Sequence, residues 1–201
     1  MAKVMTRARA RARWRVVVVD DHARSRADVR AAVVAAGGAV AGEATRGADA
    51  LAMVGGARPD IAIFAAGLPD GDGVAAAVAV TSATRCPVVL FTSHTRDDLV
   101  ARAQAGGVMA YLLKPLRPAE LAPTLDLAIA RFAETRQLRQ TLEERKVIER
   151  AKGRIMDRLH LSEDQAFSRL RRAAMNSRRP MVDVARALLV CESVTEELPS
   201  I

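Results

Sequence analysis

The feature that most constrains the fold is an alternation of short apolar runs with longer helical stretches over residues 16–127. The first run, at 16–19, is four consecutive valines, which is typical of a strand buried on both faces. Further apolar runs lie at 39–42, 60–65, 87–91 and 110–113. Five β/α units of this length predict an α/β domain with a doubly wound, five-stranded parallel sheet.

Polar side chains follow three of the predicted strands. Asp20 and Asp21 come directly after the first strand. Thr92 follows the fourth strand, and Lys114 follows the fifth. In such a sheet the carboxyl ends of the strands meet at one edge, where ligands bind. Two carboxylates, a hydroxyl and an amine there predict a pocket for a cation and a phosphoryl group.

Several short motifs in this region match a known family. They are Val-Asp-Asp at 19–21, Pro-Asp-Ile-Ala-Ile-Phe at 59–64, Leu-Pro-Asp-Gly-Asp-Gly at 68–73, Phe-Thr-Ser at 91–93 and Tyr-Leu-Leu-Lys-Pro at 111–115. With them, residues 16–127 resemble the receiver domain of bacterial response regulators. The resemblance implies that Asp20 and Asp21 are an acidic metal-binding pair. It also implies a switch hydroxyl at Thr92, a signalling aromatic at Tyr111, a phosphate-sensing amine at Lys114 and a cis peptide bond before Pro115.

The end of the third strand departs from the family pattern. Receivers carry a phosphate-accepting Asp directly after the run that ends here in Phe64, but this chain has Ala65. A methyl group neither attacks a phosphoryl donor nor coordinates Mg²⁺, so no acyl phosphate can form at this position. We therefore expect a phosphorylation-independent pseudo-receiver, whether Ala65 is natural or an introduced substitution.

Other acids near this position are poor substitutes for the missing carboxylate. Asp60 lies at the opposite end of the same strand, roughly 16 Å away at about 3.3 Å per residue. Asp70 and Asp72 belong to the turn beyond the strand. Asp20 and Asp21 then have an alternative role as strand-end and helix-capping residues. We expect no cofactor, and residual Mg²⁺ binding by this pair stays open.

A long helix is predicted to follow the sheet domain. Between Leu121 and Leu159, glycine occurs only at 153 and proline only at 123, and good helix formers dominate. An interrupted apolar stripe near 3.5-residue spacing predicts a coiled-coil linker at 128–144, and hence a homodimer. Its members are Ile129, Phe132, Leu138 and Leu142. The alternative is a single solvated connector helix.

The next segment has the pattern of three short amphipathic helices. Apolar residues at 148, 151, 155 and 159 form one face of the first. A capping box from Ser162 to Gln165 begins the second, whose predicted inward face is Phe167, Leu170 and Ala174. A break at 176–180 precedes a third helix with apolar residues at 181, 184 and 188. These elements predict a small all-α three-helix bundle at 145–190.

This bundle carries a second family resemblance. The matching motifs are Arg-Lys-Val-Ile-Glu-Arg-Ala-Lys-Gly-Arg-Ile-Met at 145–156, Leu-Ser-Glu-Asp-Gln-Ala-Phe at 161–167, Leu-Arg-Arg-Ala-Ala-Met-Asn-Ser-Arg-Arg-Pro at 170–180 and Val-Ala-Arg-Ala at 184–187. Residues 138–190 thereby resemble the ANTAR domain of the AmiR/NasR-type antitermination regulators. The resemblance implies binding to paired RNA hairpins in a nascent leader transcript, so that polymerase reads through a terminator.

The charge of the bundle agrees with a polyanionic partner. Residues 131–190 contain fifteen Lys and Arg against eight acids. Arginine suits phosphate and base-edge contacts, and arginine planes must supply any stacking if Phe167 is in the core. The candidate RNA-binding residues are Lys146, Arg150, Lys152, Arg169, Arg171, Arg172, Arg178 and Arg179. For each of them the alternative is a solvated helix face.

The two ends of the chain differ in charge from the body. Residues 1–15 carry six Lys and Arg and no acid, which predicts a disordered basic arm. Residues 191–201 carry three acids and no basic residue, which predicts an acidic tail.

Several classes of protein are not expected. No apolar run approaches the roughly 18 residues of a membrane helix. Cys86 and Cys191 lack metal-ligand spacing and are read as reduced thiols of a cytoplasmic protein. His22, His94 and His160 are isolated, and no nucleophile-and-base constellation occurs, so we expect no enzyme.

The two resemblances together imply a bacterial transcription antitermination regulator that binds leader RNA. Its receiver-like domain would be controlled by a sensor or other regulatory protein, or by assembly. One alternative is a phosphorelay response regulator whose acceptor was replaced. Another is a DNA-binding response regulator, which three short helices fit on topology alone.

Overall fold

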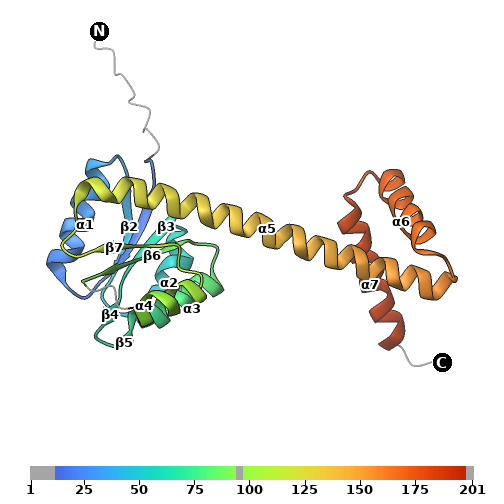
Figure 1. Cartoon of the computed structure of the whole chain (residues 1–201), viewed down its shortest axis with the longest axis horizontal. Helices are drawn as coiled ribbons and strands as arrows, with labels where there is room; N and C mark the ends of the chain where they lie inside the picture. Colours follow the sequence, from blue (N-terminus) through green and yellow to red (C-terminus); the bar gives the residue numbers. More distant parts are fainter. Residues whose placement is uncertain (1–11, 94–96, 198–201) are drawn as a thin grey trace, which may run out of the picture. The chain divides into compact units, whose positions relative to one another are not determined.

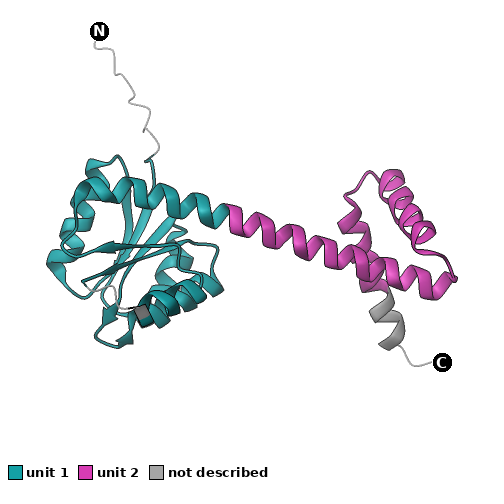
Figure 2. Ribbon diagram, viewed as in Figure 1, with its two compact units in different colours: residues 1–133 teal, residues 134–201 magenta. Residues whose placement is uncertain are grey.

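The computed structural model describes residues 12–93 and 97–197, divided between two compact units that meet at residues 133 and 134 (Figure 2). The first unit contains five parallel strands in the order β2-β1-β3-β6-β7 (Figure 1). These strands are β1 (Arg15–Val19), β2 (Ala39–Ala44), β3 (Ile61–Ala65), β6 (Val88–Thr92) and β7 (Ala110–Leu113). After β3, the turn contains a short antiparallel pair, β4 (Gly67–Leu68) and β5 (Gly71–Asp72).

Helices cover both faces of the sheet (Figure 1). They are α1 (Ala23–Ala35), α2 (Gly47–Ala57), α3 (Gly73–Ala83), α4 (Asp97–Ala105) and the first part of α5 (Pro118–Leu159). Buried residues of α1 and α5 pack on one face, and those of α2, α3 and α4 pack on the other. The prediction of a doubly wound, five-stranded parallel sheet is confirmed.

The strand β1, which lies between β2 and β3, shows why a run of valines specifies this fold. Val16 and Val18 belong to the core beneath α1 and α5, whereas Val17 and Val19 belong to the core beneath α2 and α3. All four are fully buried, because successive side chains of a strand point to opposite faces. Burying each of these side chains stabilises the folded state by about 1.5–3 kcal/mol relative to leaving it exposed. A strand with helices on both sides therefore has no polar position.

The boundary of the predicted N-terminal arm was wrong. Trp14 is 3% exposed, and its indole N–H donates to Asp126 Oδ1 of α5 at 3.0 Å. Arg13 pairs with the other oxygen of Asp126 and stacks on the Trp14 ring. Arg15 already belongs to β1. Residues 12–15 are therefore part of the sheet unit, and residues 1–11 lie outside the described residues.

The second unit is helical. It comprises the end of α5, α6 (Glu163–Ser177) and α7 (Met181–Glu197). Its buried apolar residues are Ala151, Ile155, Ala166, Leu170, Ala174 and Ala185. The predicted capping box is present, since the Ser162 hydroxyl accepts from Gln165 N and the Gln165 side chain accepts from Ser162 N.

Three details of this unit differ from the sequence analysis. The first helix is not short, because α5 is one helix of 42 residues. The helix α7 continues to Glu197, so most of the predicted acidic tail is helical backbone. Phe167 is 39% exposed, because the buried stripe of α6 runs through Ala166, Leu170 and Ala174. Among the described residues, no helix combines the length and the apolar character that a membrane crossing requires.

Candidate functional site

The strand ends bring four of the predicted pocket residues to one edge of the sheet. Asp20 follows β1 and is 1% exposed, and the pairing of Val19 with Phe64 puts Asp20 beside Ala65 on the neighbouring strand. Lys114 follows β7, and its Nζ donates to Asp20 Oδ2 at 2.6 Å. The backbone N–H of Lys114 donates to the carbonyl of the buried Thr92 at 2.8 Å. The peptide bond before Pro115 is cis, as the resemblance implied.

Asp21 points to the rim of this pocket, not into it. Its carboxylate lies 2.6 Å from His22 Nδ1 and is one-third exposed. Burial is the largest single influence on the pKa of Asp21 and acts to raise it. The hydrogen bond and charge interaction with His22, a backbone hydrogen bond and the charge of Lys114 together outweigh burial, so the pKa lies below its usual value. Arg26 donates to the backbone carbonyls of Asp20 and Asp21, which fixes the turn between β1 and α1.

The side chain at the predicted acceptor position is a methyl group, that of Ala65, in the middle of the sheet. Ala65 is 2% exposed at the end of β3, between the strands that carry Asp20 and Phe91. It offers no oxygen to this pocket.

The two acids of the following turn have other roles. Asp70 accepts from the backbone N–H groups of Gly47 and Ala48 at 2.9 Å each, and these bonds lower its pKa. It therefore caps the N-terminus of α2. Asp72 is the N-cap of α3, and its hydrogen bond from Arg102 is the main cause of its lowered pKa. Both carboxylates are held by partners outside the pocket, which agrees with the expectation that neither replaces the missing Asp.

The pocket residues do not fit the Mg²⁺ that receiver domains use. One ligand atom each of Asp20, Asp21 and His22 lie within 4.8 Å of one another. Mg²⁺ prefers oxygen ligands in octahedral geometry, usually from one or two carboxylates plus phosphate and water. Here the charge of Asp20 is compensated by Lys114, the third carboxylate is replaced by Ala65, and the third available ligand is an imidazole.

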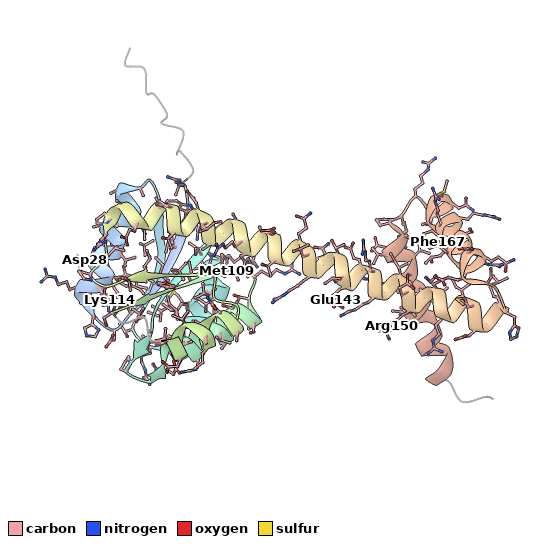
Figure 3. The ribbon with its side chains drawn as sticks, in the orientation of Figure 1. Asp28, Met109, Lys114, Glu143, Arg150 and Phe167 are labelled. Carbon is pink, nitrogen blue, oxygen red and sulfur yellow. The ribbon has the colours of Figure 1, made fainter. Side chains whose placement is uncertain are left out.

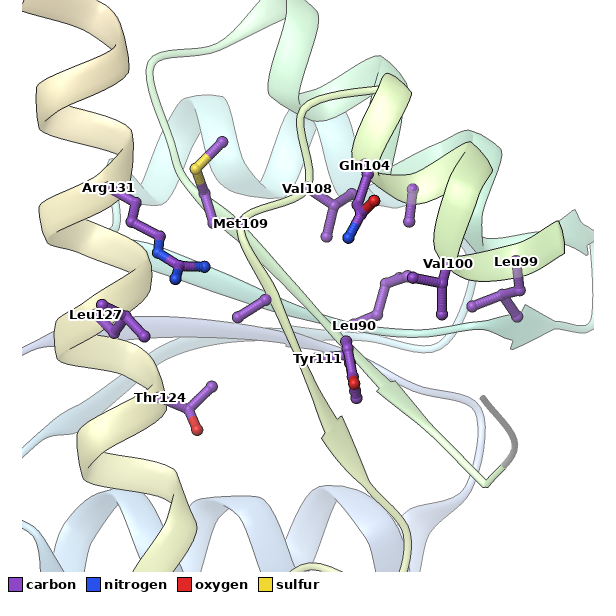
Figure 4. A pocket seen from close by; sticks show the side chains of 12 residues that line it. Leu90, Leu99, Val100, Gln104, Val108, Met109, Tyr111, Thr124, Leu127 and Arg131 are labelled. Carbon is purple, nitrogen blue, oxygen red and sulfur yellow. The ribbon is translucent and has the colours of Figure 1, made fainter. Parts of the chain in front are cut away.

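The predicted signalling aromatic lies on a different surface of the same unit. Tyr111 of β7 is 49% exposed and lines a hollow of about 270 Å³ between α4, β7 and α5 (Figure 4). Leu99 and Val100 of α4 lie on one side of its ring, and Leu127 of α5 lies on the other. The three switch residues are therefore split: Thr92 and Lys114 are at the pocket, and Tyr111 faces outward.

The structure divides the eight cationic candidates of the second unit into two groups. Six arginines are exposed, and within the described part of the chain none of them forms an ion pair or a side-chain hydrogen bond. These are Arg150, Arg169, Arg171, Arg172, Arg178 and Arg179 (Figure 3 labels the first). Lys146 is 68% exposed, and its one ion pair among the described residues is with Glu143, its neighbour one helical turn away.

Lys152 is a correction to the predicted interface. Its side chain is only 10% exposed, and its amine lies 2.6 Å from Glu149 and 2.7 Å from Glu163. The hydrogen bond with Glu149, and then that with Glu163, raises the pKa of Lys152. Two carboxylates already surround this amine, so it joins α5 to α6 and its charge is compensated within the protein.

Sequence reasoning missed a groove along the outer side of α6. It measures about 670 Å³, and its lining includes Leu161, Asp164, Ser168, Arg169, Arg172, Ala173 and Asn176. A recognisable signal was present, because polar residues recur at intervals of three and four along this helix. Only the arginines among them had been singled out.

Comparison with known proteins accounts for both units. The response regulator receiver domain family matches residues 16–126, and the ANTAR domain family matches residues 136–189. The chain belongs to the ANTAR-domain response regulators. It is 36% identical to the transcriptional regulatory protein PdtaR of Mycobacterium tuberculosis, over 87% of this chain and 89% of that protein.

Solved structures similar to this response regulator cover its receiver unit. One is the signal receiver domain of NarL from M. tuberculosis, with 36% identity, a TM-score of 0.52, and coverage of 57% of this chain and 95% of that one. Another is the receiver domain of a modulated diguanylate cyclase from Desulfovibrio desulfuricans, with 26% identity and a TM-score of 0.57. It covers 61% of this chain and 98% of that one. The two family matches and the similarity to PdtaR point to a regulatory response regulator.

Proposed function

We propose that this response regulator is a transcription antitermination protein. Its ANTAR domain would bind hairpins in nascent leader RNA, in the cytoplasm where transcripts are made. The observation that carries the proposal is the set of six exposed arginines in the second unit, Glu134–Ile201, to which the described part of the chain offers no ion pair or side-chain hydrogen bond. Uncompensated guanidinium groups attract phosphates and also donate two hydrogen bonds to one base edge or stack on it.

Control of this activity does not run through phosphorylation in our proposal. Ala65 offers no nucleophile, and the Lys114 amine is already engaged by Asp20. A sensor or other regulatory protein, or assembly of the chain itself, would then set the state of the receiver unit. Assembly into a homodimer is supported by Leu138 and Leu142 of α5, which are 61% and 56% exposed on one helix face.

Crosslinking in cells followed by sequencing of the bound RNA tests this function. We expect leader transcripts with paired hairpins ahead of a terminator to be recovered with the wild-type chain. Recovery of DNA and not RNA, or of RNA without leader hairpins, would refute the proposal.

Binding titrations at several salt concentrations test the residues. Replacing Lys146 by Ala should weaken binding to all RNAs alike and make the salt dependence shallower by about one counterion. For at least one of Arg150 and Arg172, replacement by Ala should weaken binding to the cognate hairpin more than binding to a hairpin with a scrambled loop. All three are exposed, so circular dichroism should show an unchanged fold. A folded triple variant that binds the hairpin undiminished would exclude this surface.

A further inference from the structure

The hollow between α4, β7 and α5 of the receiver unit combines an apolar lining with a few polar groups (Figure 4). Leucine, valine, alanine and methionine side chains make up most of its lining. The polar lining residues are Gln104, Tyr111, Thr124 and Arg131. Within residues 12–93 and 97–197, none of these four side chains forms a hydrogen bond or an ion pair. The hollow therefore offers apolar surface and polar groups that the described part of the protein does not use.

The charge of the lining favours an anionic ligand. Among the described residues that line the hollow, Arg131 is the one that carries a charge. Figure 4 shows its side chain extending from α5 toward β7. One guanidinium group donates two parallel hydrogen bonds to a carboxylate. A phosphate group carries a charge of about −1.5 to −2 at neutral pH, and this lining contains no second cation to compensate it. A carboxylate therefore matches Arg131 better than a phosphate does.

The size of the hollow limits the apolar part of the ligand. A dry cavity of about 150 Å³ accommodates benzene. The hollow measures about 270 Å³, so it has room for two fused rings or about ten carbons. The acidic side chains of a protein carry only one or two methylene groups, so none of them can both fill the hollow and pair with Arg131. A small molecule can do both, and the half-exposed Tyr111 ring leaves it access from solvent.

We propose that the receiver unit binds a small organic monocarboxylate in this hollow, with an apolar body of about ten carbons. The carboxylate pairs with Arg131, and the apolar body packs against Leu99 and Val100 of α4 and Leu127 of α5. The ligand contacts α4, β7 and α5 at once, so it favours the arrangement of these elements in which all three touch it. The inference goes beyond the proposed function and does not depend on RNA binding. It adds a chemical input to a receiver unit that has no carboxylate at residue 65.

Isothermal titration calorimetry with the intact chain tests the proposal, and naphthoate is the probe. Naphthylmethanol and naphthyl phosphate, substituted at the same ring position, replace the carboxylate by a neutral group and by a phosphate. Arg131→Gln removes the guanidinium group, and Val100→Phe occupies part of the hollow. The matched controls are Arg24→Gln and Val34→Phe, at exposed positions of α1 outside the hollow. Urea unfolding shows whether each variant is folded.

We expect the wild-type chain and both controls to bind one naphthoate per chain. Arg131→Gln should weaken naphthoate binding about tenfold and leave naphthylmethanol binding unchanged, because only the first ligand uses the guanidinium group. Val100→Phe should weaken the binding of both ligands, since both need the apolar space. Naphthyl phosphate should bind the wild-type chain more weakly than naphthoate does.

Three results would overturn the inference. The first is a folded wild-type chain that shows no saturable binding of naphthoate, and the second is equal affinity of the wild-type chain and folded Arg131→Gln for naphthoate. The third is sedimentation in which naphthoate separates an assembled pair of chains, because the hollow would then be an interface between copies. Naphthyl phosphate that binds more tightly than naphthoate would overturn the assignment of a carboxylate. No titration contains RNA, so failure of this inference leaves the proposed function intact.

Discussion

Replacing Ala65 by Asp should restore the acidic pocket and make the receiver unit dependent on a divalent cation. Asp20 and Ala65 are next in register after the paired residues Val19 and Phe64. Neighbouring strands lie about 4.8 Å apart. Two carboxylates at roughly 5 Å repel each other by about 3 kcal/mol at an effective dielectric constant of 20. Because the Lys114 amine can interact with both carboxylates, we expect the charge of Asp at position 65 to lower the free energy of unfolding by about 2–3 kcal/mol.

The Ala65→Asn variant is the matched control for this cost. It has the size of the Asp variant but no charge, so the difference between the two isolates the electrostatic effect. Both are compared near pH 8 in a chelator and then in excess Mg²⁺. Mg²⁺ at 100 times its dissociation constant should raise the free energy of unfolding of Ala65→Asp by about 2.7 kcal/mol. It should leave the stability of Ala65→Asn and of the wild-type chain almost unchanged.

Urea unfolding followed by tryptophan fluorescence measures these differences in stability for the receiver unit. Trp14 is the single tryptophan of the chain, and it is buried in the receiver unit. Labelling with acetyl phosphate, followed by mass spectrometry, gives a second readout. We expect an acid-labile phosphate on Ala65→Asp and none on the wild-type chain. Equal stability of the Asp and Asn variants in chelator, or labelling of the wild-type chain, would refute the reasoning.

Four further outcomes follow from the structure. Asp72→Ala should destabilise the receiver unit by about 1 kcal/mol near neutral pH through loss of the α3 N-cap. Because the folded-state pKa of Asp72 is lowered from 3.8, this difference in the free energy of unfolding should shrink as the pH falls below that value. Burial raises the pKa of the Cys86 thiol to about 12, so a thiol reagent near pH 8 should label only the exposed Cys191 until denaturant is added. Arg178→Gly should raise the free energy of unfolding of the helical unit by about 1 kcal/mol, seen as a higher urea midpoint, because Arg178 has a φ of +53° at the end of α6. The same change should weaken RNA binding. Leu138→Asp should convert a sedimenting dimer into a monomer, and a wild-type chain that sediments only as monomer would contradict the coiled coil.

The strands and their ends were predictable because the relevant information is local. A strand buried on both faces needs a continuous apolar run, and the four valines of β1 fulfil that need without reference to other residues. The order of strand ends then brings Asp20 and Lys114 to one edge, where they form a direct ion pair. The lack of a carboxylate at residue 65 is likewise a property of one position, and the fold places this position at the pocket.

The inward face of α6 shows where periodicity reaches its limit. A helical wheel places Phe167 within reach of the core, at an angle beside Leu170. The structure covers Ala166, Leu170 and Ala174 and leaves Phe167 partly exposed. A small residue such as Ala166 lets the neighbouring helices approach closely, which moves the covered stripe to one side of the largest apolar residue.

The residues alone predict the five strands of the large sheet, the capping box at Ser162 and the side chains available at the strand ends. Which charges are compensated and which remain for a partner depends on how the elements pack. Lys152 and Arg172 look alike in sequence, but two carboxylates surround the first and none pairs with the second within the described residues. The distinction depends on distances between residues on different helices, such as that from Lys152 to Glu163, and no periodic pattern along the chain encodes such distances.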